Sequence, residues 1–377
     1  MRPRYHDKSH SDTLNVPLHE MITFSPNKNI PIHRWFYYRE GYSKAFVEMC
    51  VQKYGIEGPI LDPFCGVGTT LLAAKENGFD AIGCDVSPLA RFVSETKTRN
   101  YDIEKLQDAF AELKKVKLDF PREGRVDSWT AKRFHNQTFR ELLVVKKFVE
   151  QEMKKNPLQE LAYLALIDST LRASNVERMG ASLRNSKENK GYKPIKKFWL
   201  QKLELMLKDL KKTEQQGPEP QILDDDARQL KHIASDSIGG IITSPPYLNK
   251  IEYASAYKLE LALFFEEPKT QLRSFVGKDV AAQGESDLPI VDAYLSDMEK
   301  SLKQMHRVLK VGGKAVINVA GGCFPDRVVK SDELLIELGV EQGFELEENL
   351  IARTIDCYQR NSGFVGKVNE RVFVLKK

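Results

Sequence analysis

The chain lacks any long hydrophobic run. No stretch of its 377 residues approaches the roughly 20 apolar residues that cross a bilayer, and the polar N-terminus contains no apolar segment of the kind that directs secretion. The five cysteines are scattered and never form a CxxC pair, and the seven histidines include no HExxH spacing. A disulfide framework and a structural zinc site are therefore both disfavoured. We expect a cytoplasmic protein without a membrane or metal partner.

Charge is abundant but unevenly distributed. The net charge is only +4, yet residues 131–213 contain 19 Lys and Arg against nine Asp and Glu, so this stretch is +10 and the remainder is −6. A solvated basic surface is the simpler reading of such a stretch, but the asymmetry favours a polyanionic partner, namely nucleic acid. The densest part supplies the candidate nucleic-acid-binding residues, which are Arg178, Arg184, Lys187, Lys190, Lys193, Lys196 and Lys197.

Strand and helix patterns alternate on both sides of a long helical stretch. We predict strands at 58–63, 81–85, 220–223, 239–243 and 314–319, helices at 43–54, 69–77, 292–309 and 332–342, and a terminal strand pair at 350–355 and 371–376. From about 102 to 216 strand signals vanish, and 3.6-residue periodicity predicts helices at 103–116, 137–153, 158–171 and 195–212. The expected organisation is an N-terminal lead-in at 1–30 that is loose over 1–20, an α/β domain at 31–101 and 217–377, and a basic helical insertion at 102–216 as the candidate substrate-binding region.

A glycine-bearing loop follows the first predicted strand. The run Asp62-Pro-Phe-Cys-Gly66-Val-Gly68 has GxG, but Leu71 stands where a dinucleotide fingerprint has its third glycine. The loop also lacks the GK[ST] of a phosphate-binding loop, which disfavours ATP hydrolysis. Taken alone, it could be a packing turn.

Acidic residues follow the next two strands. Asp85 ends the second strand, where a carboxylate can accept hydrogen bonds from ribose hydroxyls, and Asp224, Asp225 and Asp226 follow the strand after the insertion. No lysine or arginine sits in the glycine loop to meet a pyrophosphate. The pattern favours a nucleoside with a cationic or neutral tail, which S-adenosylmethionine satisfies.

The hexapeptide Ile242-Thr-Ser-Pro-Pro-Tyr247 follows another predicted strand. Pro245 and Pro246 fix φ and withhold two backbone donors, so the carbonyls there stay free to accept hydrogen bonds. Ser244 adds a side-chain acceptor, and Tyr247 adds a flat face. Although a Pro-Pro turn alone is ordinary, this combination suits an exocyclic aromatic amine, whose two N–H bonds meet two acceptors while its ring stacks on the tyrosine.

The series DPFCGVG, GCD and TSPPY, in this order, resembles the S-adenosylmethionine-dependent amino-methyltransferases of nucleic acids, and its TSPPY form is similar to the cytosine-N4 subgroup. The resemblance covers most of 30–100 and 220–377. It implies a doubly wound, seven-stranded Rossmann-like methyltransferase sheet whose last two strands form an antiparallel hairpin. In these families the target-recognition region usually follows the third or later motifs, whereas here the helical insertion lies between the second and third strands.

The resemblance also implies a role for each motif residue. The catalytic residues would be Ser244, Pro245, Pro246 and Tyr247, and the residues binding S-adenosyl-L-methionine would be Asp62, Phe64, Gly66 and Gly68 at its methionine end, Asp85 at the ribose and Asp226 at the adenine amine. The implied reaction is direct methyl transfer to the N4 amine of cytosine, since the chain has no Pro-Cys dipeptide of the kind C5-cytosine enzymes use. Hydrogen bonds to Ser244 and the Pro245 carbonyl would aim the amine lone pair at the methyl group.

Several alternatives stay open. DNA is favoured because it is the common substrate of the motif family, but structured RNA such as ribosomal RNA could carry the cytosine. An adenine-N6 methyltransferase is a second alternative. A protein-glutamine or RNA-purine methyltransferase would typically have Asn or Asp where Ser244 stands. A non-catalytic nucleic-acid-binding protein with a degenerate cofactor fold is the alternative from another class.

Overall fold

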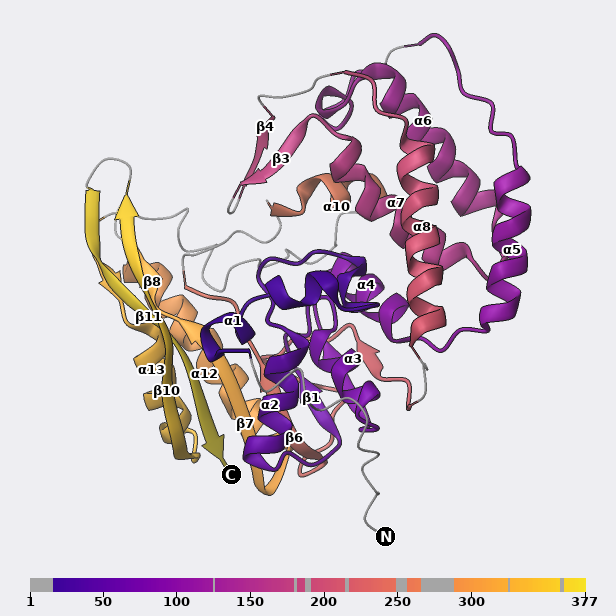
Figure 1. Ribbon diagram of the computed structural model, residues 1–377. Coiled ribbons are helices and arrows are strands. Elements are labelled where there is room, and N and C mark those ends of the chain that lie inside the picture. The colour runs from indigo at the N-terminus through magenta and orange to yellow at the C-terminus, as the bar shows by residue number, and fades with distance from the viewer. Residues whose placement is uncertain are drawn as a thin grey trace.

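A seven-stranded sheet forms the centre of the molecule. The computed structural model describes residues 16–124, 126–179, 182–186, 191–213, 217–248, 256–265, 288–324, 326–359 and 363–377. The sheet order is β10-β11-β7-β6-β1-β2-β5, and only β11 runs antiparallel to its neighbours (Figure 1). The strands are β1 (Ile60–Asp62), β2 (Ala81–Cys84), β5 (Gln221–Leu223), β6 (Ile238–Thr243), β7 (Leu309–Ala320), β10 (Glu345–Gln359) and β11 (Gly363–Lys376). The predicted doubly wound sheet with a terminal hairpin is confirmed.

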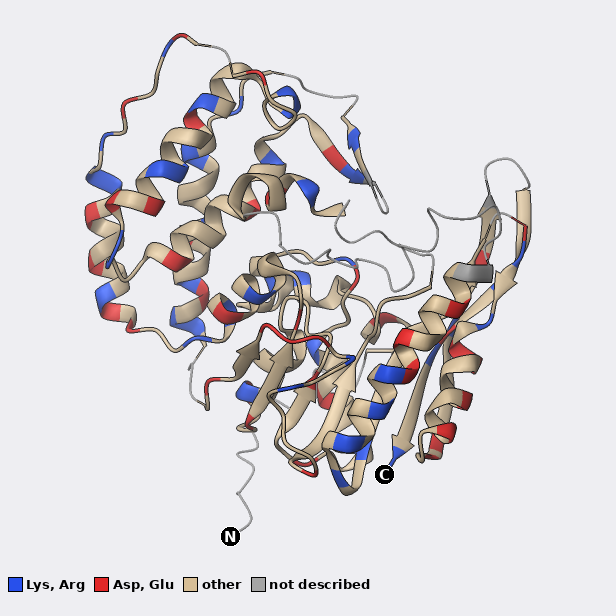
Figure 2. Ribbon diagram, turned by 180° about the vertical axis from the view of Figure 1, so that it is seen from behind, with Lys and Arg blue, Asp and Glu red and all other residues tan. Residues whose placement is uncertain are grey.

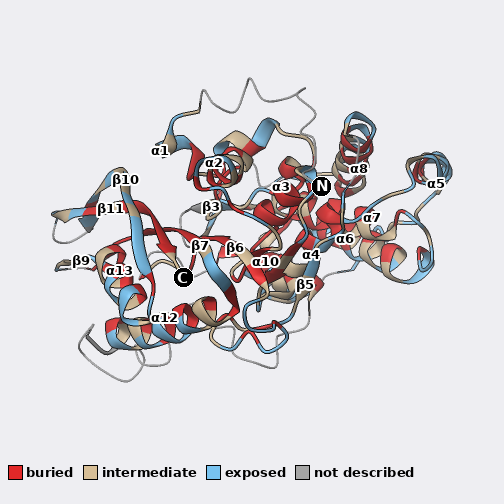
Figure 3. Ribbon diagram, turned by 90° about the horizontal axis from the view of Figure 1, so that it is seen from below, coloured by how far each residue is buried: buried red, intermediate tan, exposed pale blue. Residues whose placement is uncertain are grey.

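Helices cover both faces of the sheet, because side chains alternate along each buried strand. Ile60, Ile242 and Val316 pack beneath α2 (Lys44–Tyr54) and α3 (Thr69–Glu76). Their strand neighbours Leu61 and Ile241 lie on the opposite face, beneath α12 (Leu288–Val308) and α13 (Ser331–Glu341). Figure 3 shows the buried residues gathered along the sheet and the helix faces that lie against it. This double coverage leaves the carboxyl edge of the parallel strands as the place for a site.

The insertion is mainly helical. It contains α5 (Ile103–Lys115), η4 (Ala131–Arg133), α6 (Asn136–Lys147), the π turn η5 (Phe148–Glu152), α7 (Gln159–Ala173) and α8 (Ile195–Lys212). The predicted absence of strands is wrong, because β3 (Val176–Met179) and β4 (Ser182–Asn185) pair as an antiparallel hairpin. Four-residue strands that contain Glu177, Arg178 and Arg184 carry no run of apolar alternation for sequence reasoning to detect.

The insertion shares one hydrophobic core with the α/β domain. Trp199 of α8 and Leu166 of α7 belong to the same buried cluster as Val93 of α4 (Pro88–Thr98), a helix that the sequence reading did not identify. The cluster also includes Trp35 of η3 (His33–Trp35) and Leu259 of α10 (Lys258–Phe264). The insertion is therefore fused to the domain on the side of α4.

The predicted lead-in is partly structured. The expectation of a loose segment at 1–20 fails at its C-terminal end, where α1 (Leu18–Met21) begins, and η2 (Ser25–Asn29) follows. Met21, Ile22 and Phe24 are buried around these two turns. The side chain of Asn27 donates to the Tyr42 carbonyl at 3.1 Å and accepts from the Lys44 amide at 2.9 Å. The remaining short strands, β8 (Gly322–Cys323) and β9 (Val328–Val329), pair with each other. Among the residues described, none of the helices combines the length and the apolar character that a membrane span requires.

A buried carboxylate on α8 ties the insertion to the segment before α2. Asp209 is fully buried and accepts hydrogen bonds from both Nε (2.9 Å) and Nη2 (2.5 Å) of Arg34 and from Nε1 of Trp35 (3.2 Å). The Ile32 amide donates to the same carboxylate at 3.4 Å. The chain is thus held to α8 by charge-assisted hydrogen bonds as well as by apolar packing.

We predict that Asp209→Asn lowers the free energy of unfolding by about 2–3 kcal/mol, because Arg34 loses its buried counter-charge. Urea unfolding followed by circular dichroism measures the change. The matched control on the same helix is Glu204→Gln, which removes the exposed Glu204–Lys208 pair and should cost less than about 0.5 kcal/mol. If the two substitutions lowered the free energy of unfolding equally, Asp209 would not be the buried carboxylate that stabilises this contact.

Candidate active site

A cavity of about 610 Å³ lies where the parallel strands end. It is lined by residues that end or follow β1, β2, β5 and β6, including Asp62, Asp85, Asp226 and Ser244. In the sheet order β1 lies between β6 and β2, so the chain reverses direction across the sheet at β1. Ligands of doubly wound sheets bind at such a switch point, outside the carboxyl ends of the strands.

The carboxylate of Asp62 joins the loops around the cavity. Its Oδ2 accepts from the hydroxyls of Tyr42 (3.0 Å) and Thr70 (2.7 Å), and its Oδ1 accepts from the hydroxyl of Thr243 (2.6 Å) and the Phe64 amide (3.2 Å). Burial raises the pKa of Asp62, against the effect of these hydrogen bonds. Asp62 therefore fixes the glycine loop to the end of β6.

The two glycines of the loop have different roles. Gly66 lines the cavity at φ +49°, and its amide donates to Oδ2 of Asp85 at 2.9 Å. A Cβ on Gly68 would lie 2.2 Å from Oγ of Ser94, so Gly68 is required by the contact with α4. Behind the loop the buried Lys97 donates from Nζ to the Val67 carbonyl at 2.9 Å. Burial lowers the pKa of this lysine to about 7.

Asp85 directly follows β2 and lines the cavity. Its Oδ2 accepts from the Gly66 amide and its Oδ1 from the Ser87 amide (2.8 Å), so each oxygen keeps a second lone pair for a ligand. Burial raises the pKa of Asp85 to about 6, although the two amides lower it. The sequence prediction placed a ribose acceptor here, and the geometry is compatible with it.

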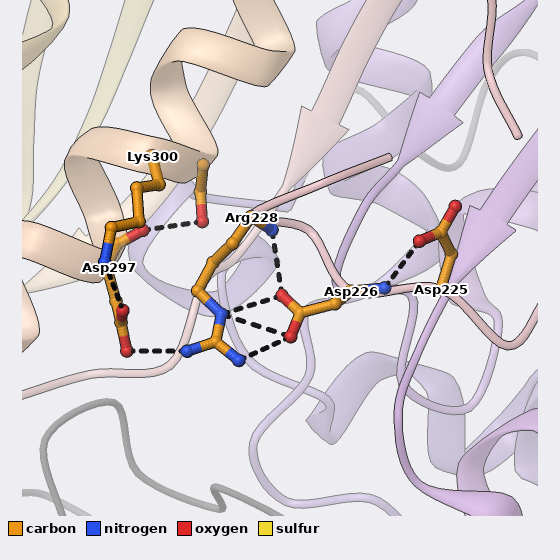
Figure 4. A network of polar contacts seen from close by, with 6 residues as sticks. Asp225, Asp226, Arg228, Asp297 and Lys300 are labelled. Carbon is orange, nitrogen blue, oxygen red and sulfur yellow. Dashed lines mark hydrogen bonds and ion pairs between the residues drawn. The ribbon is translucent and has the colours of Figure 1, made fainter. Parts of the chain in front are cut away.

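The acidic cluster after β5 contains an ion-pair network. Both carboxylate oxygens of Asp226 accept hydrogen bonds from the Arg228 guanidinium (Figure 4). Nη1 of Arg228 also donates to Asp297 on α12 at 3.0 Å. Lys300 donates to the other oxygen of Asp297 at 3.4 Å. Asp226, Arg228 and Asp297 all line the cavity. The predicted contact of Asp226 with an adenine amine would thus be made by a carboxylate that Arg228 already orients.

The loop after β6 places Ser244 and Pro246 on the cavity wall. The Ser244 hydroxyl donates to the hydroxyl of Tyr247 at 3.4 Å, and the Tyr294 hydroxyl donates to the Pro246 carbonyl at 3.1 Å. Pro245 is buried. Tyr247 packs partly against the core on the α12 side.

The Tyr247 hydroxyl is fixed by two strands. It donates to Oε1 of Glu370 on β11 at 2.7 Å and accepts from Nδ2 of Asn318 on β7 at 2.9 Å. The ring is thus held from the sheet side. Its predicted stacking on a target base stays a prediction.

The candidate nucleic-acid-binding residues occupy different environments. Arg184 and Lys197 are exposed, whereas Lys193 and Lys196 are half-buried and donate to the carbonyls of Ser174 (2.6 Å) and Val116 (2.9 Å). Lysines and arginines are spread over the outer helices of the insertion (Figure 2). The candidates Lys187 and Lys190 lie outside the described residues.

Arg178 is turned inward rather than toward solvent. Its side chain is 10% exposed, its Nη2 donates to Oε1 of Glu260 at 2.6 Å, and its guanidinium lies 4.1 Å from the ring centroid of Tyr257. These contacts commit its charge to the buried contact between β3 of the insertion and the α10 segment. A phosphate contact by Arg178 would require them to break.

Sequence reasoning missed the side chains that position the site. Tyr42, Thr70 and Thr243 hold Asp62, and Lys97 supports the loop from α4. The available signal was weak: Thr70 lies two residues after the DPFCGVG run and Thr243 is the first residue of TSPPY, whereas Tyr42 and Lys97 are remote from both motifs.

The cavity suits a nucleoside that carries positive charge. Its acidic lining residues are Glu40, Asp62, Asp85, Asp224, Asp225, Asp226 and Asp297, against Arg228, Lys231 and His232. Gly66 offers bare backbone there, since a Cβ would lie 3.3 Å from the Tyr38 ring. Within the described part of the chain, His, Cys, Asp and Glu form no group that could hold a metal ion. The sheet order and this cavity define a Rossmann-like nucleoside-binding protein.

Comparison with known proteins specifies the class further. A family model described as DNA methylase matches residues 6–91. The type II methyltransferase M.BsoBI from Geobacillus stearothermophilus is 28% identical over 277 residues, which cover 64% of this chain and 54% of the relative. M.AvaI from Nostoc sp. is 33% identical over 104 residues, which cover 26% of this chain and 20% of the relative. M.MjaII from Methanocaldococcus jannaschii is 26% identical over 145 residues, which cover 35% of this chain and 27% of the relative.

Solved structures are similar only at a low level. An S-adenosylmethionine-dependent methyltransferase from Methanosarcina mazei is 10% identical with a TM-score of 0.33, covering 84% of this chain and 91% of that chain. A TehB-like methyltransferase from Corynebacterium glutamicum is 12% identical with a TM-score of 0.33, covering 88% and 86%.

The family model and the type II relatives together indicate that the chain is similar to the S-adenosylmethionine-dependent amino-methyltransferases. The cofactor of this family is S-adenosylmethionine, and the acidic cavity fits it. The chain spans about half the length of M.BsoBI and about a quarter or less of the other two relatives.

We predict that the affinity for S-adenosylhomocysteine is highest above pH 6 and falls by about tenfold as the pH is lowered to 5. A ribose hydroxyl donates to the ionised carboxylate of Asp85, whereas in the free protein this group takes up a proton near pH 6. Isothermal titration across this range measures the change. Asp85→Asn should bind more weakly by about 1–3 kcal/mol and lose this pH dependence. A parent protein whose affinity is constant from pH 8 to 5 would contradict the prediction.

Proposed function

We propose that the protein transfers a methyl group from S-adenosylmethionine to the exocyclic N4 amine of cytosine in DNA. The observation that carries this proposal is that Ser244 and Pro246 line the same cavity as Asp62, Gly66 and Asp85. A target amine held at the Ser244 loop would thus lie in the compartment that fits the cofactor. The DNA methylase family model and the type II relatives support DNA as the substrate.

The hydrogen bond of Ser244 supports its role as the acceptor. Because its hydroxyl proton points toward Tyr247, the lone pairs of Oγ remain available to accept an N–H of the target. Tyr247 is itself held by Glu370 and Asn318, so the direction of that proton is fixed. The two prolines and the Tyr294 contact with the Pro246 carbonyl limit movement of the loop.

Positioning is the main contribution of these residues. When bound, S-adenosylmethionine supplies a methyl group on a positively charged sulfur. The chain holds the amine lone pair toward that methyl group, and alignment of this kind can correspond to an effective molarity as large as about 10⁵ M. A base in a duplex must leave the stack to reach the cavity, which costs a few kcal/mol. The TSPPY motif supports cytosine over adenine as the target.

The test is transfer of labelled methyl to DNA and RNA in parallel, followed by nucleoside mass spectrometry. We expect label in DNA as N4-methylcytosine. The Ser244→Ala variant tests the role of the serine. Its turnover should fall by at least about 100-fold while its cofactor affinity changes by less than about twofold, because only the target amine loses its acceptor. N6-methyladenine, or label confined to RNA, would contradict the substrate assignment. A large loss of cofactor affinity would contradict the role of Ser244.

We also predict that Arg184→Ala reduces the slope of log DNA affinity against log salt by about 0.9, the value for one lost phosphate contact. Arg184 is exposed on β4, so its charge is available to a polyanion. Lys193→Ala is the matched control, because its amine is held by the Ser174 carbonyl. That variant should lower stability by about 1 kcal/mol and leave the slope unchanged. An unchanged slope in Arg184→Ala would place the DNA on another surface.

A further inference from the structure

One wall of the cavity combines two aromatic rings with a carboxylate. Tyr38 and Glu40 precede α2, and Tyr257 precedes α10, yet all three line the cavity. The rings of Tyr38 and Tyr257 stack with centroids 5.1 Å apart and planes 19° apart. The Tyr38 ring lies 3.3 Å from the position of a Cβ on Gly66. This wall, defined by Tyr38, Glu40 and Tyr257, thus borders the glycine loop.

The carboxylate of Glu40 is incompletely paired. Its Oε2 accepts from the Tyr257 hydroxyl at 2.7 Å, but its Oε1 is buried without a hydrogen-bond partner among the residues that the structure describes. Burial raises the pKa of Glu40. A carboxylate in this condition costs free energy unless a further partner compensates it.

The guanidinium of Arg178 lies directly behind the wall. The Arg178 guanidinium lies against the Tyr257 ring and donates to Glu260, which is also buried. The charge of Arg178 acts on both Glu40 and Glu260, and the charge of Arg39 also acts on Glu40. The Tyr257 ring lies between the Arg178 guanidinium and the Tyr38 ring, so the wall presents the Glu40 carboxylate and the Tyr38 ring to the cavity. A carboxylate and an electron-rich ring both attract a cation.

The other acidic groups beside the glycine loop are better satisfied. Asp62 accepts four hydrogen bonds, and each oxygen of Asp85 accepts a backbone amide. Glu40 alone of these three has a buried oxygen without a partner in the described part of the chain. It is therefore the carboxylate whose environment a bound cation would improve most.

We propose that Glu40, held by Tyr257 beside Tyr38, is the subsite for the positively charged sulfonium of the cofactor. The inference rests on the proposed function, because the sulfonium is the group from which the proposed reaction takes its methyl. S-adenosylhomocysteine carries a neutral sulfur and differs from the cofactor at this position by one methyl group and one charge. The wall thus distinguishes the methyl donor from the spent product.

The test measures S-adenosylmethionine and S-adenosylhomocysteine binding by isothermal titration in the full chain. Glu40→Gln keeps the shape of the side chain and removes its charge. We expect S-adenosylmethionine affinity to fall by about tenfold while S-adenosylhomocysteine affinity stays within about twofold. Glu260→Gln is the matched control, because Glu260 is buried against the same Arg178 but does not belong to the wall. It should change both affinities by the same factor.

A second variant keeps the test decisive if Glu40→Gln does not fold. Tyr257→Phe retains the ring and removes the donor that orients Glu40, so the ratio of the two affinities should shift in the same direction by a smaller factor. Equal changes for both ligands in the folded variants would overturn the subsite. A parent protein that binds neither ligand would instead overturn the proposed function itself.

Discussion

The carboxylate of Asp62 is the interaction on which the site depends, because it accepts hydroxyls from three separate segments. Tyr42 comes from the segment before α2, Thr70 from α3, and Thr243 from the end of β6. Removing this carboxylate would leave three buried hydroxyls to find other acceptors. Asp62 thus joins the glycine loop to the Ser244 loop, and the Tyr42 hydroxyl adds a hydrogen bond to the Ile242 carbonyl at 3.2 Å. The same contacts would set the relative position of a methyl donor and of its acceptor.

The helical insertion is also joined to the α/β domain by polar contacts. Asp209 of α8 holds Arg34 and Trp35, and the hydroxyl of Tyr163 on α7 donates to the Phe264 carbonyl of α10 at 3.0 Å. α10 lies between the insertion and the cavity, where Tyr257 and Leu261 contribute to the lining. A region that was expected to bind substrate therefore also shapes the compartment in which chemistry would occur.

Sequence reasoning succeeded where a pattern is local. The apolar period over 195–212 predicted both ends of α8, and strand–turn–helix spacing located β1, α3 and β2. It failed where a structure depends on distant partners, since nothing local in Tyr42 or Thr243 indicates a shared bond to Asp62. Likewise Arg178 reads as one more basic residue, and only the fold brings Glu260 and Tyr257 against it. Charge counts predict a surface, but they do not reveal which charges the interior uses.

The two signs of charge are separated within one chain, and this separation suits the cationic cofactor and the polyanionic substrate that we propose. The insertion carries the excess of lysine and arginine, with Arg184 and Lys197 exposed, whereas Glu40, Asp85 and Asp226 line the cavity. Had Arg178 pointed into the cavity, it would have offset the negative charge that a sulfonium needs. Its burial against Glu260 and Tyr257 instead supports the wall from behind. A cationic cofactor and a polyanionic substrate can then each meet the opposite charge, because the fold keeps the basic surface outside the acidic compartment.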